Sequence, residues 1–478
     1  MARTWDLVVI GGGSAGLVAS LTAAGLGARV ALVERDRPGG DCLFTGCIPS
    51  KALIASARLA HDMRHAGRLG LTPADPEVDF ARVMERVGGA IEAAGREDTP
   101  EHLRSEGVEL VEGEAAFARP GVVIAAGREL RFRAALIATG SRPALPPVPG
   151  LADAAPLTNE DVFGLTELPP RLAVLGGGPI GVELGQAFAR LGSRVQIVEM
   201  ADRLLPREEP EAGLLIGERL AGEGVGVHTG TRAVRVESGV LHGRGPASDV
   251  EVPFDRLLAA TGRRPVTDGL GLERVGVETD EHGWIRVDRR LRTTGDHIYA
   301  AGDAVGGLFF THVAGYHGLL AMANALFRVR QKTEHEAIPW VTFTDPEVAR
   351  VGMSEAQARA RLGRDPLVFR HDFERSDRAI TASATTGFAK LVADRRGRLL
   401  GATICGEAAG ESIAEAARLV RDGGKVAELS QMVHAYPTFT EAPARAADDW
   451  WRRKYFTTGA RRFYRPLFAL MRVLDRPR

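Results

Sequence analysis

The sequence is poor in cysteine and has no excess of charge of either sign. Three cysteines among 478 residues cannot form the disulfide framework of a secreted domain. Lysine and arginine together number 61, as do aspartate and glutamate, so no global field attracts nucleic acid or an anionic membrane. We therefore expect no nucleic-acid partner.

Long hydrophobic runs are missing as well. The apolar start at residues 5–10 is too short for an export signal and leads directly into glycines. Residues 304–327 carry no charge over a length that would cross a bilayer, but polar residues such as His317 and Asn324 interrupt them. We predict a buried helix at this place and a soluble, cytoplasmic protein.

What is present is a duplicated glycine-rich unit. An apolar strand at residues 7–10, a helix at 17–26 and a strand at 29–33 recur as 172–175, 182–191 and 194–198. The glycine turns that follow the first strands are Gly11-Gly12-Gly13-Ser14-Ala15-Gly16 and Gly176-Gly177-Gly178-Pro179-Ile180-Gly181. Each second strand ends in an acid, Glu34 or Glu199. Strand, turn, helix and acid together are typical of dinucleotide binding.

Each glycine of such a turn has its own physical role. The first permits the tight turn, the second lets backbone amides approach a pyrophosphate, and the third lets helix and strand pack closely. The phosphates then lie at a helix N-terminus, and the acid accepts hydrogen bonds from a ribose hydroxyl. Two such units predict two dinucleotide sites in one chain.

A cysteine pair follows the first unit. Cys42 and Cys47 are five residues apart, and Pro49 suits the first turn of a helix. Cys47 would then lie at a helix N-terminus, where the dipole lowers the pKa of a thiol and favours the thiolate. Two cysteines supply only half of a tetrahedral zinc site, so we expect no metal site. A pair of buried structural thiols remains the alternative on spacing alone.

The segment from Gly39 to Lys51 resembles the redox-active disulfide of the class I flavin-dependent pyridine nucleotide–disulfide oxidoreductases. The resemblance covers nearly the whole chain. It includes residues 138–140 (ATG), 260–265 (ATGRRP), 299–304 (YAAGDA) and 436–441 (YPTFTE). It is strongest to mercuric reductase and its relatives, notably at residues 373–379 (FERSDRA).

The resemblance implies an α/β fold with two Rossmann-like domains and a C-terminal α+β dimerisation domain. Proline-rich breaks place an FAD-binding domain at 1–147 and 269–338, an NAD(P)-binding domain at 148–268 and the dimerisation domain at 339–478. Cys405 lies in an apolar strand and is predicted to be a packing residue.

The resemblance also implies roles for single residues. Cys47 would face the flavin and Cys42 would meet the acceptor, while Lys51 and Glu183 would form an ion pair beside the flavin. The residues expected to bind FAD are Gly11, Gly13, Ser14, Ala15, Gly16, Glu34, Gly40, Lys51, Thr139, Gly140, Asp303 and His312. Those expected to bind the nicotinamide nucleotide or lie near it are Gly176, Gly178, Gly181, Glu199 and Gly262. From the residues alone, His312 would equally suit a buried core position.

One position departs from the usual pattern of the family. Its catalytic histidine, five residues before Glu441, is replaced by Tyr436. A tyrosine, with a reference pKa near 10, is a poor general base at neutral pH. Mercuric reductases also carry a tyrosine there, but the cysteine pair that they carry near their C-terminus has no counterpart here. In the dimer that the resemblance implies, Tyr436 and Glu441 would act across the interface.

These observations predict a homodimeric FAD enzyme that passes electrons from NAD(P)H through a Cys42–Cys47 disulfide to a small-molecule or metal-ion acceptor. A mercuric-reductase-like metal or disulfide reductase is the first choice, with dihydrolipoamide dehydrogenase as the alternative. A flavin-bearing redox sensor with little turnover is the second alternative. We favour NADH over NADPH, because Glu199 would repel a 2′-phosphate, although Arg203 offsets this in part.

The segment 450–478 is strongly basic and aromatic. It holds nine lysines and arginines and one acid. Such a stretch can lie on an anionic membrane surface. From the sequence alone we favour a tail packed across the dimer over this membrane contact.

Overall fold

The computed structural model describes residues 4–474. These residues form two compact units. The first contains residues 4–64, 74–204 and 220–333, and the second contains residues 65–73, 205–219 and 334–474. The first unit therefore holds both glycine turns and the cysteine pair.

The first unit is built around a mostly parallel sheet with the strand order β3-β2-β1-β6-β5-β4, in which β16 also pairs with β6. The strands are β1 (Thr4–Ile10), β2 (Val30–Glu34), β3 (Val108–Glu112), β4 (Ala115–Arg119), β5 (Val122–Ala125), β6 (Arg128–Ile137) and β16 (Ile298–Ala300). Strands β1, β2, β3, β6 and β16 are parallel, whereas β4 and β5 form an antiparallel extension. Parallel strands are usually covered on both faces, and this sheet is.

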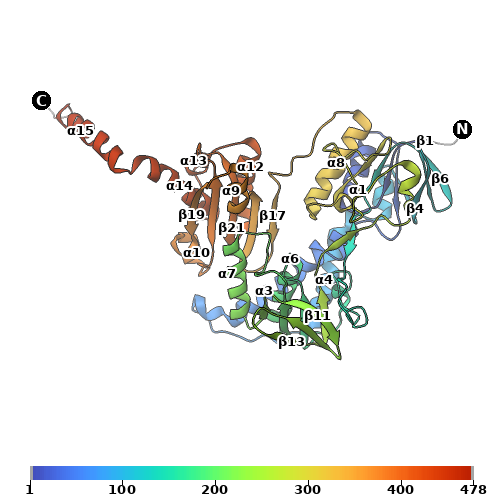
Figure 1. Ribbon diagram of the computed structural model, residues 1–478, viewed down its shortest axis with the longest axis horizontal. Helices are drawn as coiled ribbons and strands as arrows, with labels where there is room; N and C mark the ends of the chain where they lie inside the picture. The colour runs from blue at the N-terminus through green and yellow to red at the C-terminus, as the bar shows by residue number, and fades with distance from the viewer. Residues whose placement is uncertain (1–3, 475–478) are drawn as a thin grey trace. The chain divides into compact units, whose positions relative to one another are not determined.

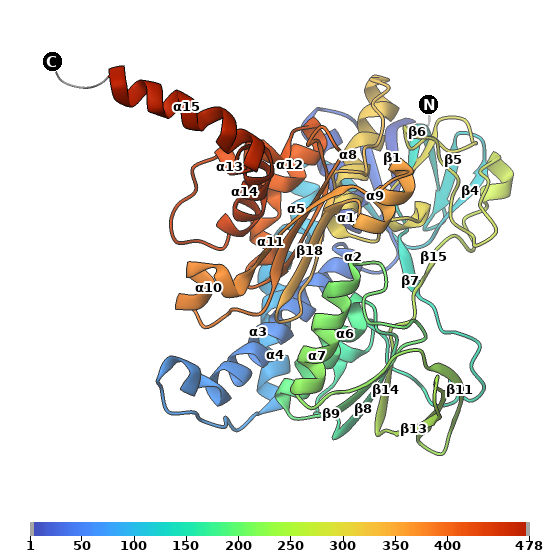
Figure 2. The ribbon, with the colours of Figure 1, turned by 60° about the vertical axis from the view of Figure 1, so that its left-hand side comes forward.

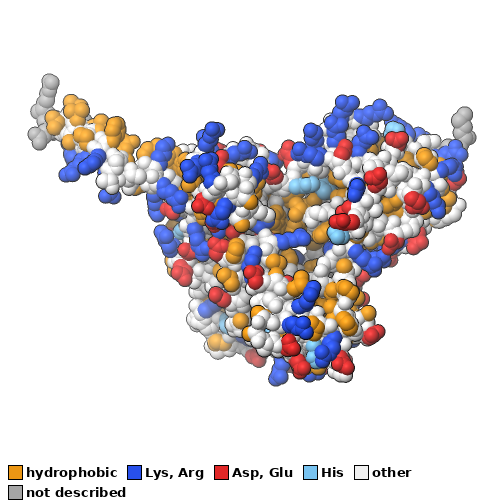
Figure 3. Space-filling model, viewed as in Figure 1, with side chains coloured by type: hydrophobic (Ala, Val, Ile, Leu, Met, Phe, Trp, Pro, Cys, Tyr) orange, Lys and Arg blue, Asp and Glu red, His pale blue; other side chains and the backbone are white. Residues whose placement is uncertain are grey.

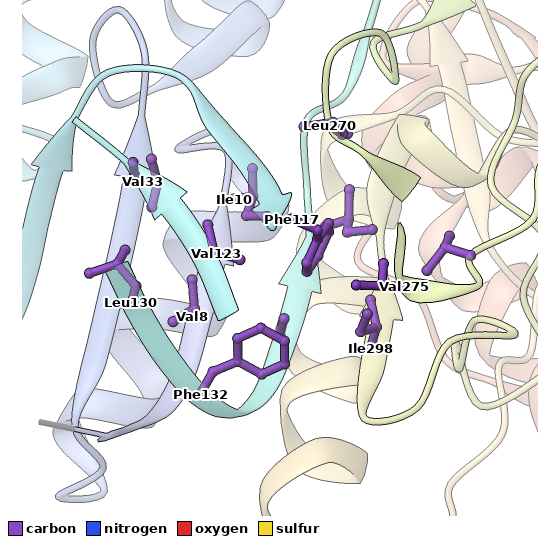
Figure 4. Packing of buried hydrophobic residues seen from close by; sticks show 14 of the residues in the cluster. Val8, Ile10, Val33, Phe117, Val123, Leu130, Phe132, Leu270, Val275 and Ile298 are labelled. Carbon is purple, nitrogen blue, oxygen red and sulfur yellow. The ribbon is translucent and has the colours of Figure 1, made fainter. Parts of the chain in front are cut away.

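Alternate residues of β1 point to two different cores. Leu7 and Val9 pack with the helices α1 (Ser14–Gly25) and α8 (Thr311–Phe327), which lie side by side (Figure 1). Val8 and Ile10 pack on the other face, with aromatic and aliphatic side chains from β4, β6 and the segment 270–298 (Figure 4). Both faces of the sheet are therefore filled, which fixes the turn after β1 in place.

A second parallel sheet has the order β10-β9-β8-β14, of which Figure 2 labels β8, β9 and β14. Its strands are β8 (Arg171–Leu175), β9 (Arg194–Val198), β10 (Gly226–His228) and β14 (Arg256–Ala259), and α6 (Pro179–Leu191) packs against it. Between β10 and β14 in the sequence, β11 (Arg232–Glu237), β12 (Val240–Arg244) and β13 (Asp249–Pro253) form an antiparallel sheet. The short strands β7 (Ser141–Pro143) and β15 (Arg263–Pro265) pair with each other. The two Rossmann-like units predicted from the duplication are confirmed.

The second unit contains a five-stranded antiparallel sheet with the order β17-β18-β21-β20-β19. Its strands are β17 (Pro339–Thr342), β18 (Glu347–Gly352), β19 (Leu367–Asp372), β20 (Phe388–Ala393) and β21 (Leu399–Gly406). The helix α14 (Glu441–Tyr455) packs on β19 and β20. Cys405 is completely buried in β21, which confirms its predicted role as a packing residue.

The remaining helices connect these layers. They are α2 (Gly40–Phe44), α3 (Cys47–Arg64), α4 (Phe80–Ala94), α5 (Pro100–Ser105), α7 (Pro210–Gly222), α9 (Glu355–Leu362), α10 (Asp377–Thr381), α11 (Ala409–Ser412), α12 (Ala414–Asp422), α13 (Val426–Gln431) and α15 (Thr458–Leu474). Within residues 4–474 no helix combines the length and the apolar character needed to cross a bilayer. The uncharged stretch singled out in the sequence contains α8, which buries His317 and Asn324.

Candidate active site

The two glycine turns have the same hydrogen-bonded arrangement. The backbone N–H of Gly12 donates to Glu34 Oε2 at 2.6 Å, and the N–H of Gly177 donates to Glu199 Oε2 at 2.6 Å. Each acid at the end of a second strand is therefore fixed against its own turn. This is the position from which a carboxylate reaches the ribose of a bound dinucleotide.

The glycines within one turn differ in what surrounds them. A Cβ atom on Gly181 would lie 1.9 Å from the carbonyl oxygen of Gly176, and a Cβ on Gly16 would lie 1.9 Å from that of Gly11. A Cβ on Gly178 would meet no atom within 4 Å, because it would point into open space at the N-terminus of α6. The open cradle over backbone amides fits a pyrophosphate.

A second set of residues fits a flavin nucleotide. The hydroxyl of Thr139, just after β6, is buried without a hydrogen-bond partner among the described residues. Buried polar groups are normally paired, so a ligand group is the expected partner. Gly140 has φ +71° and would carry a Cβ into open space. Burial raises the pKa of the Asp303 carboxyl, which accepts a hydrogen bond from Ser141 Oγ at 2.6 Å.

Gly40 lies where the first turn meets the cysteine segment. A Cβ atom at this residue would be 2.7 Å from Gly13 Cα, and its φ is +61°. Ser14 and Ala15 begin α1, and Ala15 is buried against α8, where a Cβ on Gly318 would lie 2.2 Å from the Ala15 carbonyl oxygen. The sequence-predicted FAD residues of this region are therefore brought together.

The two cysteines lie on two consecutive helices. Cys42 lies in α2 and Cys47 is the first residue of α3, and both are free thiols. The pKa of Cys47 is lowered to about 6, chiefly by a hydrogen bond from Cys42 and also by the Thr311 hydroxyl, 3.1 Å from the Cys47 sulfur, and by the charge of Lys51, all against the effect of burial. The same bond and burial raise the pKa of Cys42. Cys47 is therefore the thiolate of the pair.

An ion pair lies beside the cysteines. Lys51 Nζ is 2.8 Å from Glu183 Oε2 and joins α3 to α6. The Glu183 side chain is 8% exposed, so this carboxylate is held away from water by its partner and its surroundings. The ion pair expected from the family resemblance is present.

Sequence reasoning missed a polar network in the turn that carries Cys42. Asp41, directly before Cys42, accepts from Arg263 at 2.7 Å and from Asn159 Nδ2 at 2.9 Å, and also from the hydroxyl of Thr45. Arg263 lies within the ATGRRP motif, which was the only available signal. The network ties the Cys42 turn to β15, which begins at Arg263, and to the loop that holds Asn159.

His312 and Gly262 are placed differently from the other predicted residues. His312 is exposed and stacks on Phe310 with ring centroids 5.5 Å apart, so the reading of a buried core histidine is wrong. Its neighbour Thr311 is the residue that contacts Cys47, and the sequence did not single it out. Gly262 has φ +128° and no atom within 4 Å of a Cβ position.

The remaining predicted residues belong to the second unit. The Tyr436 hydroxyl donates to Asp377 Oδ2 at 2.9 Å, and this bond to a carboxylate raises the pKa of the phenol. Tyr436 is 66% exposed. Glu441, at the start of α14, pairs with Arg445 at 3.0 Å. The phenol therefore stays protonated at neutral pH and reaches the surface.

The histidine next to this motif has other partners. His434 Nε2 lies 2.9 Å from Glu415 Oε2, and its Nδ1 lies 3.1 Å from the carbonyl oxygen of Met432. Its side chain is 7% exposed. This arrangement supports a structural role for His434. Within residues 4–474 no cluster of three or more His, Cys, Asp and Glu residues has the arrangement of a metal site.

Comparison with known families accounts for most of the chain. A family model described as pyridine nucleotide-disulphide oxidoreductase matches residues 5–318, and the dimerisation domain of the same family matches residues 338–447. Both matches agree with the two sheets of the first unit and the antiparallel sheet of the second.

Individual relatives cover nearly the full length. A mercuric reductase of Streptomyces lividans is 39% identical over 93% of this chain and 95% of its own. Dihydrolipoyl dehydrogenase 2 of Haloarcula marismortui is 38% identical over 92% of this chain and 96% of its own. Among solved structures, the Cu(II) complex of an HOCl-induced flavoprotein disulfide reductase from Escherichia coli has a TM-score of 0.81 at 29% identity, covering 92% of this chain and 99% of that one.

Proposed function

The chain belongs to the pyridine nucleotide-disulphide oxidoreductases, flavoproteins that use FAD and NAD(P)H, and we propose that it is a cytoplasmic reductase of thiophilic metal ions. Electrons would leave the Cys42–Cys47 pair for the acceptor, and NAD(P)H would restore the dithiol. FAD, when bound, carries the electron pair from the nicotinamide to the cysteines. The proposal concerns which acceptor this chain's residues serve best.

The protein residues divide this work. The first glycine turn and Glu34 would hold the adenosine half of FAD, while Thr139 and Asp303 supply polar groups for the rest of it. The second turn and Glu199 would hold the nicotinamide nucleotide. The Lys51–Glu183 ion pair would lie between the two nucleotides and fix the orientation of α3, which carries Cys47.

The side chain at position 436 determines which class of acceptor the dithiol reduces well. Reduction of a disulfide by the Cys42–Cys47 dithiol forms one disulfide, breaks another and delivers two protons to the leaving thiolates. A group with a pKa near neutrality performs this transfer well, and a phenol whose pKa Asp377 raises does not. Reduction of Hg(II) by the dithiolate transfers two electrons, releases Hg(0) and closes the disulfide without returning a proton. Soft thiolate ligands also favour such ions.

His434 does not supply the missing base. Its two ring nitrogens are occupied by Glu415 and by the Met432 carbonyl, and its ring is almost fully covered. Moving a proton to a substrate would require breaking one of these contacts. The contacts of His434 therefore support the metal-ion proposal over a dihydrolipoamide dehydrogenase function. Overall sequence identity does not distinguish the two, because the identities to the mercuric reductase and to the dihydrolipoyl dehydrogenase, 39% and 38%, are nearly equal.

The nicotinamide nucleotide is proposed to be NADH. The Glu199 carboxylate is fixed at the turn by Gly177, where it can accept from a 2′-hydroxyl and would repel a 2′-phosphate. Arg203, which pairs with Asp202 at 2.9 Å, offsets this repulsion only in part. We expect a higher kcat/KM for NADH than for NADPH in steady-state oxidation. A higher kcat/KM for NADPH would contradict the assignment.

The proposal is tested by a panel of acceptors with the purified FAD-loaded enzyme. NADH oxidation is followed with Hg(II), Cu(II), lipoamide, glutathione disulfide and quinones at matched concentrations. The expected order places Hg(II) above both disulfides. Lipoamide as the fastest acceptor would establish the dihydrolipoamide dehydrogenase alternative, and slow turnover with every acceptor would establish the redox-sensor alternative.

A further inference from the structure

Helix α15 (Thr458–Leu474) differs from every other long helix described in the chain. None of its residues is buried. Phe463 is 71% exposed, Leu470 57% and Leu474 71%. Large apolar side chains rarely gather on a surface unless they meet a partner. The helix therefore presents an apolar face that the described residues leave uncovered.

Most of the exposed side chains are sorted by face, with Leu470 and Val473 outside the apolar side. Apolar residues recur three and four positions apart along one side of the helix, as expected for an amphipathic helix. They are Ala460, Phe463, Tyr464, Leu467, Phe468, Met471 and Leu474. The arginines at 461, 462, 465 and 472 fall on the opposite side. No aspartate or glutamate occurs between residues 450 and 474. Figure 3 shows apolar side chains along one edge of this segment and basic ones along the other.

The last turn of α14 and the residue that follows it extend the same chemistry. Trp451 and Tyr455 stack with ring centroids 5.5 Å apart, and Lys454 Nζ lies 5.2 Å from the centre of the Tyr455 ring. Phe456 is 69% exposed. Aromatic rings beside cationic side chains suit the boundary between lipid headgroups and acyl chains.

We propose that α15 is an interfacial helix that binds the protein to an anionic lipid surface. Its apolar face would enter the boundary of the acyl chains, and its arginines would contact anionic headgroups. The helix has a pronounced apolar face, a polar face of one charge sign and no length sufficient to span a bilayer, which is the pattern of a helix that lies in the membrane plane. Each basic residue near such a surface adds attraction.

A second copy of the chain is the less suitable occupant. The match to the family's dimerisation domain ends at residue 447, so α15 lies outside the matched domain. A protein partner would need a surface that is apolar and also acidic along its rim to match the arginines. An anionic lipid surface supplies both properties at once.

The stability of α15 also favours a lipid surface as its partner. Most helical stability in proteins comes from packing of an apolar face, and residues 4–474 bury no residue of α15. Pro466 lies inside the helix and removes one of its backbone N–H donors. Burial of the apolar face in lipid would supply the missing stabilisation.

The test is co-sedimentation of the full-length FAD-loaded protein with vesicles. Phosphatidylcholine vesicles are compared with vesicles that also contain phosphatidylglycerol, at low and at high salt. We expect at least about tenfold more bound protein on the anionic vesicles at low salt, and loss of this excess at high salt. No excess on the anionic vesicles at low salt would overturn the proposal.

Three double variants separate the contributions. Leu467→Asp with Met471→Asp removes the apolar face, and Arg461→Glu with Arg465→Glu reverses charge on the polar face. Both should abolish the excess while leaving NADH oxidation in solution unchanged, which shows that the protein is folded. Arg395→Glu with Arg396→Glu, on an exposed turn after β20, is the matched charge control and should bind as the wild type does.

Two further outcomes would overturn the proposal. Equal loss of binding in the Arg395/Arg396 control would show that net charge, and not α15, governs attachment. Conversion of a dimer to a monomer by the Leu467/Met471 variant, with vesicle binding unchanged, would assign the apolar face of α15 to a second copy. Neither outcome depends on the identity of the electron acceptor, so the proposal stands or falls independently of the metal-reductase assignment.

Discussion

Cys47 is distinguished from Cys42 by the groups that contact its sulfur. Cys42 donates a hydrogen bond to it, the Thr311 hydroxyl lies 3.1 Å away, and Lys51 adds a positive charge. Together these lower the pKa of Cys47 to about 6. Because an acid whose pKa is lowered is ionised above that pKa, Cys47 is a thiolate at neutral pH and becomes a thiol as the pH falls through about 6.

We predict that this titration is visible in the FAD-loaded Cys42→Ser variant, in which the serine hydroxyl can still donate to Cys47. A thiolate beside an oxidised flavin gives a long-wavelength absorbance band, and this band should fade as the pH falls through about 6. Thr311→Val, which removes only the hydroxyl, should move the midpoint upward by up to about one pH unit. The measurement is an absorbance titration of the single and double variants.

Two controls make this titration specific. Thr311→Ser retains a hydroxyl and should leave the midpoint in place, and Cys47→Ser should show no band at any pH. An unchanged midpoint in Thr311→Val would mean that the Thr311 hydroxyl does not act on the thiolate. Full acceptor turnover by Cys42→Ser would refute the relay through the cysteine pair.

Single residues show where sequence reasoning reaches its limit. The helix N-terminus at Cys47 was predictable because its signals, Pro49 and the following helical pattern, are local. The contact between Cys47 and Thr311 joins residues 264 positions apart and leaves no trace in spacing or periodicity. The sequence analysis therefore singled out His312, whereas its neighbour Thr311 makes the contact with Cys47.

At the scale of elements, the turn between β8 and α6 combines two different demands on glycine. Gly181 faces the carbonyl of Gly176 at a distance that no Cβ can occupy, so it serves the packing of helix on strand. Gly178 has φ −76° and open space at its Cβ position, so the protein alone would accept a side chain there. The fold therefore does not require a glycine at position 178, and we propose that the bound nucleotide does.

We predict opposite phenotypes for two substitutions in this turn. Gly178→Ala should leave the free energy of unfolding within about 0.5 kcal/mol of the wild type and raise the KM for NADH about tenfold or more. Gly181→Ala should destabilise the protein by about 1–3 kcal/mol or prevent its folding, because the clash is with backbone. The measurements are denaturant unfolding and steady-state kinetics of NADH oxidation.

Both substitutions leave the first turn intact, so FAD content serves as their common control. An unchanged KM in Gly178→Ala would show that the pyrophosphate does not approach this position. A stable Gly181→Ala protein would contradict the packing argument.

The elements themselves were largely predictable. The strands at 7–10 and 172–175 extend by at most three residues in the structure, as β1 and β8, because each combines an apolar run with a glycine stop. The helix expected to have Cys47 at its N-terminus is α3, which begins at that residue. The polar network of Asp41, Asn159 and Arg263 was not predictable, because its members are more than 100 residues apart and exist as a group only after folding.

At the scale of the whole molecule, the cysteine pair and the Tyr436 motif belong to different units of the chain. The match to a dimerisation domain supports a homodimer, and we propose that Tyr436 of one subunit serves the cysteines of the other. In a twofold dimer this arrangement gives two equivalent composite sites.

Complementation between two impaired variants tests this arrangement. Co-expressed Cys42→Ser and Tyr436→Phe chains form mixed dimers in which one composite site has both wild-type residues. Metal-ion reduction should therefore recover to about a quarter of the wild-type rate, given random assembly. Activity no higher than the average of the two separate variants would place Tyr436 and the cysteines of one site in the same subunit.

The central claim is that the residue at position 436 decides the acceptor, and exchange of its side chain tests this most directly. Rates of NADH oxidation with Hg(II) and with lipoamide are compared for the wild type, Tyr436→Phe and Tyr436→His. An imidazole at this position, within reach of the Asp377 carboxylate, would supply a base with a pKa near neutrality. We predict that the wild type reduces Hg(II) faster than lipoamide, that Tyr436→Phe slows metal reduction, and that Tyr436→His raises lipoamide turnover about tenfold or more. Wild-type turnover of lipoamide well above that of any metal ion, together with no effect of Tyr436→His, would contradict the account.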